Sequence, residues 1–469
     1  MTYKYLGVKQ HFGHGDSLTT KTEVDGVLQS LVGKAVTCGL DSKITARIFN
    51  SCVAGKARYY LATGLWTRVQ SDVQLDRHVR SRLSEFGFHY RTASVDRLYL
   101  PRHLDGRGLA SLAVTHDQAL LALASYCQTA TCDFPRKIWE ASYELDQQNR
   151  KTLVSRTRAV VECYDSISMA AESGRLSMSN QNGEMQVVEA TDRRKLGRLV
   201  LRTQTEARVA RLREKAIHGV FFRNMETLGI EHCSRWLVDG LLAPFDEAKM
   251  TVAQDGTLKT RKYCREVLKE QISPICRRCG REPESVGHIL SACDKHKFSL
   301  YKNRHDEALR PVHSVLCDLF GVKAPAIRKA PPPVLENDRI KVLWDPVIVT
   351  TVDMTERRPD MVVFFKETKK IVIVEQTCPW ESRLNLALWE KRNKYAMLLQ
   401  DLMKQYQEWS VKQCTLVMGV MGSFEKDIYV KELSSLVIND EQMLDRLLAN
   451  VQRATILGSV RVIKNHLAE

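Results

Sequence analysis

Hydrophobic and polar positions follow two different periodicities along this chain. Apolar residues recur every three or four positions from about 16 to 92, and for the most part again from 113 to 270. This spacing predicts helices. Between these stretches, residues 98–112 are rich in Pro and Gly and predict a turn-rich connection.

The rhythm changes after a proline-rich stretch at 321–338. It contains three consecutive prolines, which cannot continue a helix or a central strand. Short β-branched and aromatic runs beyond it predict strands at 339–351, 361–365, 370–377 and 414–422. A long helix is expected from about 382 to 408, followed by two helical stretches. Strands alternating with helices predict an α/β domain.

One acidic residue stands out in the run at 370–377. Glu375 falls where the strand should be buried, and a buried carboxylate costs several kcal/mol unless something pairs with it. Asp360 lies just before the preceding run, so a hairpin would bring the two acids together. Two such carboxylates could form a Mg²⁺ site completed by water. The alternative is a buried structural ion pair, and the spacing alone leaves both open.

The next predicted helix supplies candidate cations. Nucleases of the PD-(D/E)xK type carry a lysine two residues after the second acid, where this chain has Thr377. Lys391, Lys394 and Tyr395 follow at i, i+3 and i+4, which places them on one face of a helix. We expect Lys391 and Lys394 to be catalytic, because a lysine beside a metal can orient water or neutralise developing charge.

Four residues have the spacing of a zinc knuckle. Cys276, Cys279, His288 and Cys293 form the pattern C-x2-C-x8-H-x4-C. Two thiolates on a tight turn, with a His and a Cys on the following helix, would fill the four tetrahedral positions of a structural zinc. The alternative is a chance arrangement of free thiols and an imidazole. Knuckles of this size typically position a nucleic-acid strand.

Charge indicates a polyanionic partner. The chain carries a net charge of +15 and has a pI of about 9.2, which favours nucleic acid. The predicted helix at 192–215 holds nine Lys or Arg and three acids. The candidate phosphate contacts on it are Arg193, Arg194, Lys195, Arg198, Arg202, Arg208 and Arg211. A solvated surface helix would show the same composition.

Other classes of protein are disfavoured by the sequence. No apolar run approaches the ~18–20 residues of a membrane span, and the N-terminal residues lack the apolar segment of a signal peptide. The 13 cysteines are therefore interpreted as reduced thiols of a cytosolic or nuclear protein. We expect a nuclear location and no membrane partner. The oligomeric state stays open.

Four motifs in order carry a family resemblance. The knuckle is followed by Arg304-His305-Asp306, then by Arg358-Pro359-Asp360, then after fourteen residues by Glu375, and then by the lysine-bearing helix. In this order they resemble the C-terminal part of the polyprotein of site-specific non-LTR retrotransposons with a restriction-like endonuclease. Residues 3–8, 98–109 and 257–268 resemble the end of that family's reverse transcriptase palm, its thumb and its linker.

The resemblance implies a multi-domain α and α/β protein. It has a helical thumb and linker, a small zinc knuckle and a PD-(D/E)xK restriction-endonuclease-like α/β domain. The implied order is a thumb-like helical region (1–115), a helical basic linker (116–270), the knuckle with the Arg-His-Asp helix (271–320), a Pro-rich linker (321–337), the endonuclease core (338–432) and C-terminal helices (433–469).

The resemblance also implies a function. The chain is expected to be a Mg²⁺- or Mn²⁺-dependent DNA endonuclease that nicks a double-stranded target for target-primed reverse transcription, with the element's RNA as a second partner. Arg304, His305 and Arg358 are implied nucleic-acid contacts, although His305 also suits a structural network. The chain has no Asp-Asp pair, so the polymerase motif would lie before Met1 and no polymerase active site is expected.

Two other functions stay open. One is a nucleic-acid-binding remnant, or a co-opted protein, with a decayed nuclease. The other is a zinc-stabilised scaffold in a nuclear complex.

Overall fold

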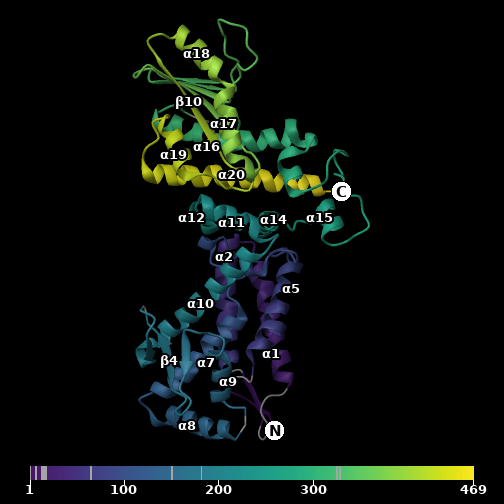
Figure 1. Cartoon of the computed structure of the whole chain (residues 1–469), viewed down its shortest axis with the longest axis vertical. Helices are drawn as coiled ribbons and strands as arrows, with labels where there is room; N and C mark the ends of the chain where they lie inside the picture. The colour runs from purple at the N-terminus through teal and green to yellow at the C-terminus, as the bar shows by residue number, and fades with distance from the viewer. Residues whose placement is uncertain are drawn as a thin grey trace. The chain divides into compact units, whose positions relative to one another are not determined.

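The fold was examined in a computed structural model, which describes residues 2–5, 8–11, 18–63, 66–148, 151–180, 182–323, 326 and 329–468. It is a mixed structure, mostly helical with small sheets (Figure 1). The chain forms two compact units. Unit 1 comprises 1–216 and 239–248, and unit 2 comprises 217–238 and 249–469.

Unit 1 is built mainly from helices that pack around two apolar cores. Its helices are α1 (Leu18–Val36), α2 (Ser42–Ile48), α3 (Gly55–Thr63), α4 (Arg68–Gln70), α5 (Arg77–Glu85), α6 (Val95–Tyr99), α7 (Leu112–Thr129), α8 (Asp133–Gln147), α9 (Leu153–Val161) and α10 (Arg193–Glu214). Two short strands, β1 (Thr2–Tyr5) and β2 (Val8–His11), pair antiparallel before α1.

The turn-rich connection between α6 and α7 is held by buried charges. Arg97 pairs with Asp105 at 2.7 Å, and Arg107 pairs with Glu247 at 2.5 Å. All four side chains are at most 1% exposed. Because each buried charge has a partner, this loop is an ordered part of the core rather than a surface connection.

Unit 1 also contains a small sheet that the helical periodicity of 113–270 does not predict. Strands β3 (Ile167–Met169), β4 (Leu176–Ser179) and β5 (Met185–Val187) form an antiparallel meander. The strands are three or four residues long, too short for a clear period of two. The turn between β4 and β5 carries the signal, because Gly183 has φ +83° in the left-handed region that glycine adopts readily.

Unit 2 joins several helices to one five-stranded sheet. Its helices are α11 (Gly219–Leu228), α12 (Ile230–Cys233), α13 (Arg235–Asp239), α14 (Pro244–Gln254, shared with unit 1), α15 (Arg261–Glu266), α16 (Lys302–Leu319), α17 (Leu384–Lys394), α18 (Ala396–Gln405), α19 (Lys426–Ser434) and α20 (Glu441–Leu467). Its strands are β6 (Val334–Glu336), β7 (Ile340–Trp344), β8 (Met361–Phe365), β9 (Lys370–Thr377) and β10 (Ser410–Val417).

The sheet has the order β10-β9-β8-β7-β6. The pairs β6–β7, β7–β8 and β8–β9 are antiparallel. Strand β10 follows the α17–α18 crossover and pairs parallel with β9. The predicted strands at 361–365 and 370–377 are confirmed with the same bounds as β8 and β9. Strand β7 is shorter than the predicted 339–351, and β10 begins and ends earlier than 414–422.

Helices cover both faces of this sheet. One face packs Val363, Val372 and Leu416 against α16, α19 and the long α20 (Figure 1). The other face packs Ile371 and Ile373 under Tyr395 and α18. Because alternate residues point to opposite faces, the second face is also the one toward which Asp360 and Glu375 point.

Two segments differ from their predicted form. The helix expected from 382 to 408 is divided into α17 and α18 at Tyr395, whose φ of −102° and ψ of 12° are not helical. The Pro-rich stretch includes strand β6, and residues 324, 325, 327 and 328 lie outside the described residues. Residues before and after this stretch share one apolar core, since α16 packs on the sheet.

Within the described ranges, no helix has the length and apolar character that crossing a membrane requires.

Candidate nuclease site and zinc cluster

The hairpin of β8 and β9 brings the two predicted acids together. The antiparallel register pairs Met361 with Val374, so Asp360 and Glu375 are the next residues along the two strands. The Asp360 carboxylate accepts a hydrogen bond from the backbone N–H of Gln376, at 2.8 Å. The two acids therefore lie beside each other at one end of the hairpin, where the predicted hairpin was expected to bring them together.

Glu375 is buried, and only one of its two carboxylate oxygens has a hydrogen-bond partner among the described residues. Its side chain is 2% exposed, and its Oε1 accepts a hydrogen bond from Lys391 Nζ at 2.5 Å. Lys394 Nζ lies 3.7 Å from the same oxygen. Oε2 has no hydrogen-bond partner among the described residues. Burial, together with the nearby Asp360 carboxylate, raises the pKa of Glu375 despite both lysines.

Asp360 is tied to a histidine from α16. His305 Nε2 lies 2.9 Å from Asp360 Oδ2 and 2.8 Å from the Gln376 carbonyl oxygen, while Nδ1 lies 3.0 Å from Asp306. Burial opposes the charged imidazolium, yet Asp360 and Asp306 raise the pKa of His305 well above its ordinary value. The imidazolium in turn helps to hold the pKa of Asp360 low against the effect of burial.

The two lysines differ in their surroundings. Lys394 Nζ donates to the hydroxyl of Tyr395 at 2.8 Å, and that hydroxyl donates to the Arg358 carbonyl at 2.9 Å. Lys391 points directly at Glu375. Of the two predicted lysines, Lys391 therefore lies closer to Glu375.

The two acids supply oxygen donors that lie close to each other. Glu375 has a buried oxygen without a partner among the described residues, and burial and the Asp360 carboxylate raise its pKa, which a bound cation would counteract. Mg²⁺ and Mn²⁺ favour such oxygen ligands and keep several waters. His305 and Lys391 occupy one oxygen of each acid, so a metal bound there would share or displace these contacts.

The four predicted zinc ligands lie together. The ligand atoms of Cys276, Cys279, His288 and Cys293 all lie within 4.8 Å of one another. Cys279 Sγ is 3.4 Å from His288 Nε2, and Cys276 Sγ is 4.0 Å from Cys293 Sγ. This cluster could hold a metal such as zinc, for which three thiolates and an imidazole are a standard closed ligand set.

A tight turn and a π-helical turn position these ligands. Gly280 follows Cys279 with φ +68°, which closes the first turn, and its N–H donates to the Cys276 carbonyl at 3.0 Å. His288 begins a single π-helical turn that ends just before Cys293, rather than a regular helix. The N–H groups of Arg278 and Cys279 lie 3.4 and 3.5 Å from Cys276 Sγ, and such donors stabilise a thiolate.

The end of α20 reaches the cluster, a contact that the sequence did not reveal. His466 is fully buried, and its Nε2 lies 3.6 Å from Cys276 Sγ and 3.2 Å from Glu284 Oε2. Its Nδ1 lies 2.9 Å from His296 Nε2. The guanidinium of Arg278 donates to the backbone carbonyls of Asn465, His466 and Ala468. The knuckle and the C-terminal helix therefore form one packed structure.

Two predicted nucleic-acid contacts lie in the interior. Arg304 is 2% exposed and donates to the Leu290 carbonyl at 2.9 Å, and Arg208 is 7% exposed beneath the ring of Tyr99. Neither side chain can reach a phosphate, so the expectation for both is corrected. Counting the charges on a helix does not show which face it buries.

Most of the other predicted contacts are exposed, whereas Arg193 and His305 are partly buried. Arg358 is 62% exposed and forms a bidentate pair with Asp345 at 2.7 and 2.8 Å. Arg211 pairs with Asp96 at 2.9 Å. Arg193 lies over the ring of Tyr126 and is partly buried. The exposed cations of α10 among the predicted contacts are Arg194, Lys195, Arg198, Arg202 and Arg211.

A buried acid near the start of α17 was missed. Glu381 is 8% exposed and accepts a hydrogen bond from the Met421 N–H at 2.6 Å. Burial raises its pKa to about 8. Gly419 permits this approach, because a Cβ there would lie 2.0 Å from Glu381 Oε2. In the sequence this glutamate looks like an ordinary acid in the first turn of a helix.

No protein-family model matches the sequence, and a search among curated proteins likewise finds no match.

Proposed function

We propose that this chain is a metal-dependent DNA endonuclease, of the kind carried by non-LTR retrotransposon polyproteins. It would nick a double-stranded target for reverse transcription and would act in the nucleus. The observation that supports this most is the pair Asp360 and Glu375, on one face of a hairpin, with an unpartnered buried oxygen on Glu375 and a lysine beside it.

Asp360 and Glu375 are the proposed ligands of Mg²⁺ or Mn²⁺. When bound, such an ion lowers the pKa of a coordinated water and offsets the charge that develops on the phosphate. Lys391, whose Nζ already lies on Glu375, would hold the attacking water or donate to a phosphate oxygen. His305, which Asp306 holds in place through its contact with Nδ1, would fix the orientation of Asp360.

The charge of the chain supports nucleic acid as the substrate. Its net charge is +15, and exposed cations lie on α10. Contacts of this kind bind the phosphate backbone without reading sequence. The element's RNA is the proposed second partner, on the strength of the resemblance alone.

We assign a structural role to the proposed zinc. Its four ligands would leave no open coordination position. Cys276 contacts His466 of α20, and α20 packs against α16, which carries His305. Zinc would therefore support the nuclease site through α16 and α20 rather than take part in cleavage.

The alternative is a nuclease that has lost activity but still binds nucleic acid. The ion pairs of Asp360 with His305 and of Glu375 with Lys391 suit that alternative, because they satisfy much of the buried charge without a metal. A direct assay separates the two functions.

The test is a nicking time course on supercoiled plasmid with Mg²⁺ or Mn²⁺, for the parent and for Asp360→Ala. The variant should lose nicking and keep DNA binding, since binding depends on cations elsewhere. Asp353→Ala is the matched control, because Asp353 is exposed on the loop just before β8. It should nick like the parent.

Metal binding gives a second readout. Mn²⁺ titration of the parent should show one weak site that Glu375→Gln removes, because that change keeps the shape but deletes the charge. If Asp360→Ala nicks as fast as the parent, the metal site is refuted and Glu375 becomes a structural acid. If the parent never nicks its proper target, the inactive nuclease is the correct description.

A further inference from the structure

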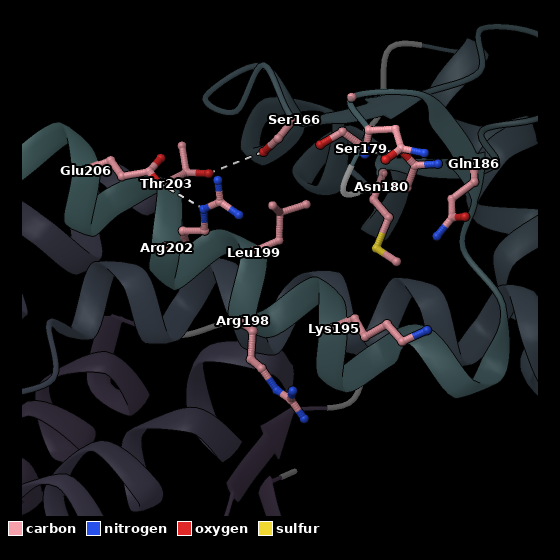
Figure 2. A pocket seen from close by; sticks show the side chains of 13 residues that line it. Ser166, Ser179, Asn180, Gln186, Lys195, Arg198, Leu199, Arg202, Thr203 and Glu206 are labelled. Carbon is pink, nitrogen blue, oxygen red and sulfur yellow. Dashed lines mark hydrogen bonds and ion pairs between the residues drawn. The ribbon is translucent and has the colours of Figure 1, made fainter.

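A pocket of about 860 Å³ lies in unit 1, between the three-stranded sheet and α10. Figure 2 shows Ser179, Asn180 and Gln186 along one wall of the pocket, and the α10 side chains along the other. Its volume lies toward the upper end of the range for ligand pockets, about 300–1,000 Å³.

The α10 wall is cationic. It presents Lys195, Arg198 and Arg202, with Glu206 as the only acid among the described lining residues. Arg198 has no hydrogen-bond or ion-pair partner in the described part of the chain. Arg202 pairs with Glu206 at 2.8 Å, but both side chains are more than half exposed, so the pair exchanges readily for another anion.

The spacing of these cations suits a chain of phosphates. Lys195 and Arg202 are seven residues apart, which is about 10 Å along a helix at 1.5 Å per residue. Successive phosphates along one stacked strand rise about 3.4 Å each. The cationic wall therefore spans about three phosphates of one strand.

The opposite wall offers hydrogen bonds. It contains the side-chain amides of Asn180, Asn182 and Gln186 and the hydroxyls of Ser166 and Ser179. Asn180 is engaged in its own turn, because its Oδ1 accepts from the N–H groups of Asn182 and Glu184. Among the described residues, the Gln186 amide has no partner, and it can both donate and accept.

We infer that this pocket binds a single strand of polynucleotide, with the phosphates along α10 and the bases toward β4 and β5. A duplex keeps its bases stacked and paired, so their edges could not enter between a helix and a sheet. None of the described lining residues has an aromatic ring, so the bases are held by hydrogen bonds rather than by stacking. This site is separate from the proposed nuclease residues and involves no cleavage.

The experiment measures binding by the full-length protein carrying Asp360→Ala, so that cleavage cannot interfere. Fluorescence anisotropy follows a labelled single-stranded RNA, a single-stranded DNA of the same sequence and the matching duplex, each from 0.15 to 1 M salt. Arg198→Ala and Arg202→Ala alter the pocket. Arg213→Ala is the control, because Arg213 is exposed on the same helix, does not line the pocket and is not among the predicted nucleic-acid contacts.

Each pocket variant should flatten the slope of log affinity against log salt by about 0.7 for single strands. That change corresponds to about a fourfold loss of affinity at 0.15 M salt, relative to 1 M. Gln186→Ala should weaken binding of the intact strand and leave binding of an abasic strand unchanged. The RNA and DNA arms show which sugar the pocket accepts.

Equal losses for Arg213→Ala and the two pocket variants would overturn the proposal, because a general cationic field would then explain binding. Equal losses for the duplex and the single strands would also overturn it, because a duplex backbone would then be the ligand. Neither result depends on whether the chain nicks DNA.

Discussion

The contact between the knuckle and the end of α20 gives a prediction whose size can be worked out. Arg278→Ala removes a guanidinium that donates to the His466 carbonyl at 3.0 Å and to the Asn465 carbonyl at 2.8 Å, with a third bond to Ala468. It also removes a positive charge from a helix C-terminus, where a cation stabilises by about 0.3–1 kcal/mol.

Hydrogen bonds to charged groups contribute about 1.5–3 kcal/mol when buried. These bonds are partly or fully exposed, so solvent screening reduces them to about the level of a surface contact, 0.5–1 kcal/mol each. Together with the helix dipole, we expect Arg278→Ala to lower the free energy of unfolding by about 2–4 kcal/mol. For a unit of this size that lowers Tm by about 4–16 °C.

The matched control is Arg281→Ala. Arg281 lies in the same knuckle, but it pairs with Asp294 across an exposed surface, with side chains 75% and 62% exposed. Such a pair contributes about 0–1 kcal/mol. Both variants leave the four candidate ligands in place, so any difference between them reports the contact with α20.

The assay is thermal unfolding of metal-loaded protein, combined with amide hydrogen exchange. In Arg278→Ala, exchange should accelerate in the last turns of α20, around residues 459–467, and stay unchanged near its start at 441–450. Stripping the metal should produce the same local change, because His466 packs on Cys276. Equal Tm values for the two variants, with unchanged exchange in α20, would refute the reasoning.

Two further predictions concern the lysines beside Glu375 and the buried Glu381. Lys391→Ala should reduce the nicking rate by about two to four orders of magnitude relative to the parent. Lys394→Ala should reduce it less, because Lys391 Nζ is 2.5 Å from Glu375 Oε1 and Lys394 Nζ is 3.7 Å away. The reverse order in a plasmid time course would contradict this. The stability of the parent should fall as pH rises from about 5 to 8, because Glu381 keeps its proton up to a pKa of about 8 when folded but releases it near 4.5 when unfolded. In urea unfolding at several pH values, the free energy of unfolding should change less with pH for Glu381→Gln than for the parent. Equal pH dependence in the two proteins would rule out Glu381 as the source of the stability loss.

The hairpin could be read from the sequence because its signals are local. Two β-branched runs separated by a charged turn define β8 and β9. In an antiparallel hairpin of that length, only one register places the first residue of β8 opposite the end of β9. The proximity of Asp360 and Glu375 follows from that register. The clustering of Cys276, Cys279, His288 and Cys293 was also predictable, because the four residues lie within one short segment.

Other features depend on contacts between distant segments. No local pattern shows that His466 packs on a knuckle far earlier in the chain, or that Arg304 enters the interior beside Leu290. The small sheet of unit 1 was missed for a different reason. Its strands are too short to compete with the flanking helical periodicity, although the Asn182-Gly183 turn is a hairpin signal.

The missing strand lysine is best explained by the geometry of the sheet face. Thr377 lies two residues after Glu375 and therefore points to the same face, where a lysine of the usual spacing would reach the proposed metal. The crossover helix α17 passes over that face, and Gln413 of β10 donates to the Lys391 carbonyl at 2.9 Å. This bond fixes α17 to β10, and Lys391 therefore reaches Glu375 from the helix that covers the sheet rather than from the same strand. On the proposed function, what matters is a cation on this face of the sheet, and the element that supplies it is free to change.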